Sequence, residues 1–241
     1  MDSSVMNLTK QREQNMREQI KIIENLEEKG VRFLSTDGVT IEPTAEIAAG
    51  TVILQGTIIK GNSKIGKNNI LGPNTIIDNS VIGDDCVINS TQIESSTLEN
   101  KVTTGPFCHI RPKCVIKNGA HLGNFVEVKN SVVGENTKAG HLTYIGDSDV
   151  GKDVNFGCGT ITANYDGIKK ARTNIGDRAF IGSNVTLVAV PDGIKVEADG
   201  YIAAGSTITK DVPAGALAVS RARELKIAEG WVEKHRSKGK K

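Results

Sequence analysis

"IAAGTVILQGTIIKGNSKIGKNNILGPNTII", residues 47–77, carries an aliphatic side chain at every sixth position. These positions are Ile47, Ile53, Ile59, Ile65, Leu71 and Ile77. A six-residue period fits neither an amphipathic helix, whose period is 3.6, nor a half-buried strand, whose period is 2. It is typical of hexapeptide repeats that wind into a parallel β-helix.

The six-residue step returns twice further along the chain, at Ile110, Ile116, Leu122 and Val128, and at Ile175, Ile181 and Leu187. Each hexapeptide would form one side and one corner of a triangular coil, so three hexapeptides would complete a turn. The 26 glycines suit sharp corners, and the 4% aromatic content suits a narrow interior. The sequence therefore predicts an all-β solenoid, a left-handed parallel β-helix of hexapeptide repeats, over residues 38–219.

The flanking segments have different patterns. Residues 9–29 predict a helix that Thr9 caps and Gly30 ends. One face of this packing helix would carry Met16, Ile20, Ile23 and Leu26. We expect an N-terminal helix and linker over residues 1–37.

Residues 220–241 are expected to form a C-terminal arm with a short helical segment and a basic tail. The tail, "HRSKGKK" from His235, is solvated in the ordinary case, and polyanion binding is the alternative.

Two segments break the six-residue step. They are "TANYDGIKKARTN", residues 162–174, and "VAVPDGIKVEADGY", residues 188–201. The first is expected to be an extruded loop, and the second strains the spacing. Loops carried on a rigid scaffold often hold binding residues.

Composition narrows the class of protein. A formal net charge of +2 does not indicate a nucleic-acid binder. The four cysteines contain no C-x-x-C pair and no signal peptide precedes them, which predicts free thiols in the cytoplasm. No apolar run approaches the roughly 18 residues that span a bilayer, so no membrane insertion is expected.

Arg111 and Lys129 are three hexapeptides apart, so they should lie on the same face in successive coils. Two cations at strand spacing repel each other unless an anion lies between or in front of them. Either both point to solvent or pair with acids such as Glu127, or they form a phosphate site. The sequence alone leaves both interpretations open.

His141 lies in "KAGHLTYIGD", residues 138–147, near that face. A neutral histidine is suited to accept a proton at neutral pH. A zinc site of the kind known in this fold needs three histidines, two of them spaced H-x-x-x-x-H. No two of His109, His121 and His141 have that spacing, so no metal site is expected. A general base and simple packing remain open.

Four long stretches resemble one family. They are "GPFCHIRPKCVIKNGAHLGNFVEVKNS" (105–131), "KAGHLTYIGDSDVG" (138–151), "NFGCGTITANYDG" (155–167) and "AGALAVSRARE" (214–224). From about residue 9 onward, the chain resembles the glucosamine-1-phosphate N-acetyltransferase half of the bacterial bifunctional enzyme that makes UDP-N-acetylglucosamine.

The resemblance implies a role for each matching residue. His141 is similar to the family's proton acceptor. The implied sugar-phosphate contacts are Arg111, Lys129, Tyr144, Asn155, Asn164 and Lys170. The implied acetyl-CoA contacts are Cys158, Asn164, Tyr165, Ser183, Ala204 and Arg221. The family uses acetyl-CoA without a metal and forms homotrimers with sites between subunits, which we expect here.

The chain departs from the family in three respects. Cys158 stands where the family often has alanine, so we do not expect it to be a nucleophile. Residues 188–200 form a segment about three residues longer than in the family, which bears on the placement of Ala204 and on the acetyl-CoA channel. Nothing before residue 30 resembles the Gly-rich loop of the uridylyltransferase half, so that activity is not expected, and a separate uridylyltransferase would be a partner.

Two alternatives to this function stay open. The acceptor would be another amino sugar, a sugar nucleotide or serine in the first. In the second, the chain would be a non-catalytic hexapeptide-repeat scaffold.

Overall fold

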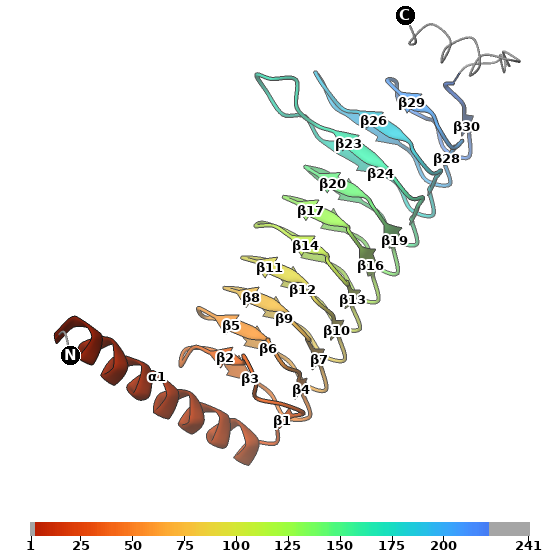
Figure 1. The fold of residues 1–241 in the computed structure, drawn as a ribbon. Coiled ribbons are helices and arrows are strands. Elements are labelled where there is room, and N and C mark those ends of the chain that lie inside the picture. Colours follow the sequence, from red (N-terminus) through yellow and green to blue (C-terminus); the bar gives the residue numbers. More distant parts are fainter. Residues whose placement is uncertain (1–2, 222–241) are drawn as a thin grey trace, which may run out of the picture.

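The structure is a computed structural model in which residues 3–221 are described. Helix α1, Ser3–Glu28, leads into thirty strands of two to four residues that wind around one axis (Figure 1). One circuit around this axis, normally three strands, is called a coil below. The expected helical segment after residue 222 and the basic tail lie outside the described residues.

The strands form three parallel sheets, because each coil adds one strand to each sheet in turn. Sheet A contains β1 (Arg32–Phe33), β4 (Val52–Ile53), β7 (Ile70–Leu71), β10 (Val87–Ile88), β13 (Thr103–Thr104), β16 (His121–Asn124), β19 (Lys138–His141), β22 (Asn155–Phe156), β25 (Phe180–Ile181), β28 (Tyr201–Ile202) and β30 (Leu217–Ala218). Sheet B contains β2 (Thr40–Ile41), β5 (Ile58–Lys60), β8 (Ile76–Asp78), β11 (Gln92–Glu94), β14 (His109–Ile110), β17 (Glu127–Lys129), β20 (Tyr144–Gly146), β23 (Ile161–Ala163), β26 (Thr186–Val188) and β29 (Thr207–Ile208). Sheet C contains β3 (Glu46–Ile47), β6 (Lys64–Ile65), β9 (Val81–Ile82), β12 (Thr97–Leu98), β15 (Val115–Ile116), β18 (Val132–Val133), β21 (Ser148–Val150), β24 (Thr173–Ile175) and β27 (Ile194–Val196). The predicted parallel β-solenoid is confirmed.

The core lies on the solenoid axis. All thirteen aliphatic positions of the six-residue pattern are buried, none of them more than 7% exposed. Between Ile77 and Ile110 the pattern lapses because several sides of the triangle are one residue shorter there. Ile82, Ile88, Ile93 and Leu98 continue the buried pattern in this interval with steps of five or six, and Val102 is also buried there.

A matched pair of substitutions tests this inward packing. Ile77 is fully buried, whereas its neighbour Ile76 on β8 is half-buried. Ile77→Ala is expected to lower the free energy of unfolding by about 2–5 kcal/mol, through lost burial and the cavity it leaves. Urea unfolding at one protein concentration measures it, with Ile76→Ala as the control. Equal losses in both variants would contradict the inward placement of Ile77.

Helix α1 ends as predicted but begins earlier. Gly30 has a φ of 88°, and its N–H bonds Glu27 O at 2.9 Å while Val31 N–H bonds Leu26 O at 3.0 Å. These two bonds form a Schellman motif, which needs a left-handed residue where glycine stands. The prediction that Thr9 caps the helix was wrong, because the helix begins at Ser3 and Thr9 lies inside it.

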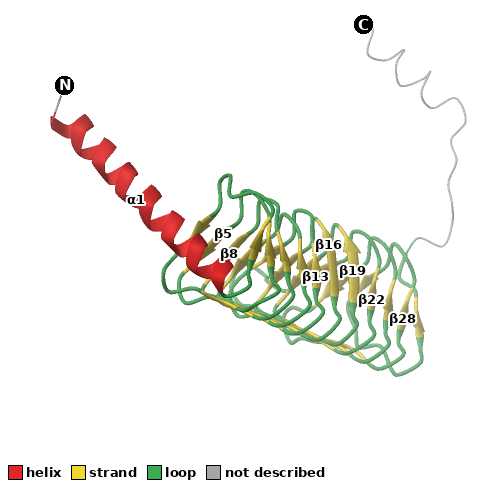
Figure 2. Cartoon of the chain, turned by 90° about the horizontal axis from the view of Figure 1, so that it is seen from below, coloured by secondary structure: helices red, strands yellow, loops and turns green. Residues whose placement is uncertain are grey.

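The helix contacts the solenoid through its C-terminal part, and the rest projects away (Figure 2). Leu26 is buried, and the Gln19 amide bonds both the N–H and the C=O of Ile41, each at 2.9 Å. Met16 and Ile20 are 64% and 52% exposed. The predicted packing face is therefore wrong at these two residues, which line an open groove between the helix and residues 36–40.

Two coils are longer than the rest. Most strand pairs join residues about three hexapeptides apart or slightly less, but Ser148 pairs with Thr173 and Thr173 with Ile194. The extra residues of the first long coil form the predicted loop. This loop is limited to residues 164–172 because Thr162 and Asn174 belong to strands β23 and β24. The second long coil contains the predicted longer segment, residues 188–200, and is longer than three hexapeptides.

Candidate active site

Arg111 and Lys129 lie in successive coils of sheet B. Strands β14 and β17 pair Ile110 with Val128, and the Arg111 N–H bonds Val128 O at 2.8 Å. Lys129 in turn pairs with Gly146 of β20. The predicted stacking of the two cations is confirmed.

Both cations are paired with carboxylates. Arg111 Nη1 lies 2.9 Å from Glu127 Oε1, and Lys129 Nζ lies 3.3 Å from Asp147 Oδ2. The acid-pairing interpretation is therefore right about Glu127. It does not remove the phosphate interpretation, because a third cation joins the pair.

Lys170 is that third cation, and it reaches the pair from the loop 164–172. The loop folds back through an antiparallel bridge between Tyr165 and Lys170, and the Asp166 carboxylate accepts the N–H groups of Ile168 and Lys169 at 2.8 and 2.7 Å. Lys170 lies against Lys129, whose positive charge lowers the pKa of Lys170. Three basic side chains thus gather at this end of sheet B, two of them in ion pairs with Glu127 and Asp147, and the Glu94 carboxylate also lies near Arg111.

Asp147 is a residue of this site that the sequence analysis missed. Its carboxylate accepts hydrogen bonds from Lys129 Nζ, from Asn130 Nδ2 at 2.5 Å and from Asn164 Nδ2. Burial would raise the pKa of Asp147, but the bonds from Asn130 and Lys129 outweigh burial and lower it. The signal was available, since Asp147 follows Lys129 by the same step of three hexapeptides that separates Lys129 from Arg111.

Tyr144 extends along sheet B toward the three cations. A Cβ built on Gly146 would collide with the Tyr144 phenol, so the ring occupies the space that any other residue at 146 would fill. The hydrogen bond with Glu127 is the largest cause of the raised pKa of Arg111, and the pKa of Lys129 is raised by its contact with Lys170 and its bond to Asp147. Tyr144 lies near enough to influence both. The structure therefore brings together Arg111, Lys129, Tyr144, Asn164 and Lys170, called the cation cluster below.

A second group of predicted residues forms a line at the corner between sheets A and B. Strands β19, β22, β25 and β28 are neighbours in sheet A. Each residue of the line stands two positions after a residue of its strand that pairs with the next strand. Asn184 N–H bonds Cys158 O at 2.7 Å, and Gly205 N–H bonds Ser183 O at 2.8 Å, which continues the register. The members of this line, called the histidine column below, are His141, Cys158, Ser183 and Ala204. Arg221 joins its end, since Nη1 donates to Ala204 O at 2.9 Å.

The hydrogen bond of His141 fixes which nitrogen is free. Nδ1 lies 2.9 Å from Asn124 Oδ1, on the strand that pairs with β19. An amide oxygen only accepts, so Nδ1 carries the proton of the neutral ring and Nε2 keeps its lone pair. This arrangement suits a general base.

The other histidines have different partners. His109 on sheet B lies 3.3 Å from Glu94, and His121 on sheet A lies 2.7 Å from Thr103 Oγ1. In residues 3–221, no three histidine, cysteine or acidic side chains are placed to hold a metal ion.

The single chain leaves the two groups apart. The histidine column follows the A–B corner, whereas Arg111 and Lys129 stand at the far end of the sheet B strands. Asn155, a predicted sugar-phosphate contact, lies on β22 of sheet A and not in the cation cluster. Tyr165 stays in the loop and is 56% exposed, with its hydroxyl donating to Gly167 O at 2.6 Å.

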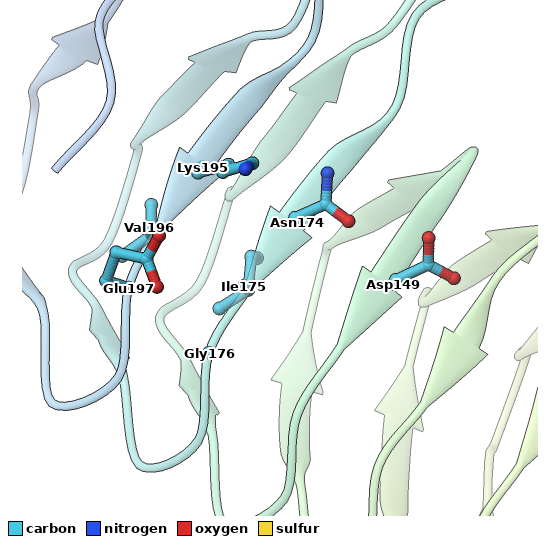
Figure 3. A pocket seen from close by; sticks show the side chains of 7 residues that line it. All are labelled: Asp149, Asn174, Ile175, Gly176, Lys195, Val196 and Glu197. Carbon is cyan, nitrogen blue, oxygen red and sulfur yellow. The ribbon is translucent and has the colours of Figure 1, made fainter. Parts of the chain in front are cut away.

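A polar groove of about 310 Å³ on sheet C lies outside both groups (Figure 3). Asp149, Asn174 and Lys195 line it from β21, β24 and β27. Asp149 also binds Arg172 through two bonds of 2.7 and 2.6 Å, and Arg172 reaches Asn130 O at 3.3 Å. The groove thus borders the base of the loop that carries Lys170.

The four cysteines differ in accessibility, which predicts their reactivity. Cys86, Cys108 and Cys114 are buried, and burial raises the pKa of Cys86 to about 11 and of Cys108 to about 12. Cys158 is partly exposed. We expect a thiol reagent to modify one cysteine rapidly in the folded protein, and none in Cys158→Ala. Rapid modification of the alanine variant would contradict this placement.

Family models match two parts of the chain. "GlmU-like, C-terminal hexapeptide" matches residues 68–158, and "Hexapeptide repeat of succinyl-transferase" matches residues 172–210. The first range includes Arg111, Lys129 and His141, and its printed description agrees with the resemblance found in the sequence.

Curated relatives extend this agreement. The bifunctional protein GlmU of Pelobacter propionicus is 55% identical over 130 residues, which are 54% of this chain and 27% of that protein. GlmU of Streptococcus thermophilus is 56% identical over 136 residues, 56% of this chain and 29% of that protein. The chain is therefore homologous to the C-terminal hexapeptide region of GlmU, and its aligned part spans less than a third of these relatives' length.

Among solved structures, LpxA from Acinetobacter baumannii matches at 20% identity with a TM-score of 0.48, over 86% of this chain and 77% of that one. The polysialic acid O-acetyltransferase OatWY matches at 15% identity with a TM-score of 0.33, over 87% and 98%. The fold assignment rests on the strand pairing described above.

No helix in residues 3–221 combines the length and apolar character that crossing a membrane requires.

Proposed function

We propose that this chain transfers the acetyl group of acetyl-CoA to the amine of glucosamine-1-phosphate, giving N-acetylglucosamine-1-phosphate for UDP-N-acetylglucosamine synthesis. The observation that carries this proposal is the convergence of Arg111, Lys129 and Lys170 at one end of the sheet B strands, together with a histidine whose Nε2 is free at the opposite end of that sheet. Homology to the GlmU C-terminal region supports the same choice of substrates. We also propose a cytoplasmic location, where free thiols persist.

In this reaction His141 Nε2 takes a proton from the amine as its nitrogen attacks the thioester carbonyl. The new C–N bond forms, the C–S bond breaks, and the coenzyme leaves as a thiolate that takes up the proton from the imidazolium. General-base help of this kind is worth about 10²- to 10⁴-fold in rate. A backbone N–H near Cys158 would stabilise the oxyanion, as such donors do in other acyl transfers.

The cation cluster would hold the phosphate and so position the amine. Phosphate and amine sit on neighbouring carbons of this sugar, only a few bonds apart. Lys129 pairs with Gly146 at the end of β20, whereas His141 ends β19 on the other side of the corner between sheets A and B. We therefore propose a homotrimer in which one subunit's His141 meets a neighbour's cation cluster.

The histidine column would bind acetyl-CoA. Ser183 and Ala204 offer small side chains, and Arg221 adds a guanidinium at the end of the line. These features suit acetyl-CoA, which has an extended thiol arm and an anionic end. Asn164 and Tyr165 would contribute from the neighbouring loop.

Product analysis tests the proposal. Acetyl-CoA labelled with ¹³C in the acetyl group is incubated with glucosamine-1-phosphate, glucosamine, a UDP-amino sugar or serine, and products are identified by mass spectrometry. We expect labelled N-acetylglucosamine-1-phosphate as the main product. A preferred second acceptor would replace the substrate assignment, and no product together with no binding of any CoA ester would favour the scaffold alternative.

A further inference from the structure

Asp147 contacts the cation cluster and is buried, at 4% exposure. It has a φ of 47°, a left-handed conformation that costs a residue other than glycine about 1 kcal/mol or more. Such a backbone aims the carboxylate inward, at Lys129 and Asn164. Left-handed residues recur at the corners of this solenoid, Asn130 with the same φ among them, so burial sets Asp147 apart: a buried charge is costly unless it is paired and hydrogen-bonded.

The contacts of Asp147 link Lys129 to both ends of the loop that carries Lys170. Its carboxylate meets Lys129 Nζ and Asn164 Nδ2, and Asn164 begins the loop that carries Lys170. Its backbone N–H bonds Lys129 O at 2.9 Å, and its C=O accepts the N–H of Thr173, where the loop rejoins the sheet, at 3.1 Å. One residue thus connects the stacked cations to both ends of the loop.

The charge of Asp147 has a specific consequence for Lys129. The Lys129 side chain is only 21% exposed and has two other cations near it, Lys170 and Arg111. Without a counter-charge, this ammonium would turn away or lose its proton. With Asp147 in place, one ammonium proton is committed to the carboxylate and the others stay available for an anion.

We propose that Asp147 is a positioning residue that holds Lys129 charged and oriented for the acceptor's phosphate, an inference that rests on the proposed function. It contacts no substrate itself. Its effect is confined to acceptors that carry a phosphate.

Asp147→Asn tests this, because asparagine keeps an oxygen for Asn164 Nδ2 while it removes the charge opposite Lys129. KM for glucosamine-1-phosphate is expected to rise about tenfold or more, as loss of a charge-assisted hydrogen bond predicts. The kcat value should change less than about threefold, and KM for acetyl-CoA and kcat/KM for unphosphorylated glucosamine should stay unchanged. Asp199→Asn is the matched control, since Asp199 is also left-handed and paired with an arginine, Arg178, but lies outside the site.

A direct binding measurement separates this inference from the proposed function. Glucose-1-phosphate, which has no amine to acetylate, is titrated calorimetrically into the unmutated protein and Asp147→Asn. Binding by the unmutated protein and at least tenfold weaker binding by the variant support the inference. Equal binding overturns the inference alone, and neither binding nor acetylation by the unmutated protein overturns both.

A double variant covers the case in which Asp147→Asn does not fold. Lys129→Met/Asp147→Asn removes both charges together, which avoids a buried unpaired charge. If Asp147 acts through Lys129, this variant binds glucose-1-phosphate within about twofold of Lys129→Met alone. Binding that is tenfold weaker than in Lys129→Met would show an independent role and contradict the proposal.

Discussion

Replacing His141 by alanine is expected to lower kcat for acetyl transfer by about 10²- to 10⁴-fold, the usual contribution of a general base. The reason is that Nε2 is the free acceptor of the ring, while Nδ1 is bonded to Asn124 Oδ1. The side chain is exposed, so the variant should unfold at nearly the same temperature as the unmutated protein. Initial rates of thiol release from acetyl-CoA, at saturating glucosamine-1-phosphate, measure the effect.

His121→Ala is the matched control for this prediction. His121 lies on β16, the neighbouring strand of sheet A, but its ring bonds Thr103 Oγ1 and it is outside the histidine column. We expect its kcat to match that of the unmutated protein. Full activity in His141→Ala, or an equal loss in both variants, would remove the base role from His141 and leave the acetyltransferase proposal standing.

Replacing Lys129 by methionine is expected to lower kcat/KM for glucosamine-1-phosphate by about 10- to 100-fold, since a hydrogen bond to a charged group is worth about 1.5–3 kcal/mol. Unphosphorylated glucosamine should react at an unchanged rate, so the variant loses selectivity more than it loses activity. The measurement is kcat/KM for the two acceptors side by side. Lys129→Met also leaves the buried Asp147 without its cation, so its unfolding temperature should fall.

Lys117→Met separates a phosphate role from the loss of an ion pair. Lys117 Nζ lies 2.8 Å from Glu99 Oε1, and its side chain belongs to neither the cation cluster nor the histidine column. We expect this variant to keep the selectivity for the phosphorylated acceptor. If Lys129→Met lost activity on both acceptors equally, Lys129 would not bind the phosphate.

The sequence predicted the solenoid because its interior accepts one kind of side chain at one spacing. Each aliphatic residue of the six-residue pattern, such as Ile53 or Leu122, is buried on the solenoid axis. Between Ile77 and Ile110 the six-residue spacing is absent, because five-residue sides change the spacing of the buried residues without changing the fold. The start of α1 was also missed, since Val5, Met6 and Leu8 continue a helix as readily as the residues after Thr9.

The candidate site was predictable where it follows the coil spacing. Arg111 and Lys129 stack because they are one coil apart, and the same spacing would have found Asp147. The position of Lys170 was not predictable from spacing, because it depends on the Tyr165–Lys170 bridge and the turn at Asp166 within an irregular loop. The separation of His141 from Lys129 across sheet B also became visible only in three dimensions.

That separation gives the most direct test of the whole account. His141→Ala and Lys129→Met chains with different affinity tags are co-expressed, and assemblies that carry both tags are purified and assayed for acetylation of glucosamine-1-phosphate. In a mixed ring of three, about one interface in three pairs an intact His141 with an intact neighbouring Lys129. At glucosamine-1-phosphate concentrations below KM we expect about a third of the unmutated rate, from two chains that are each at least tenfold less active alone. Mixed assemblies no more active than the separate variants would contradict a site built from the two edges of sheet B.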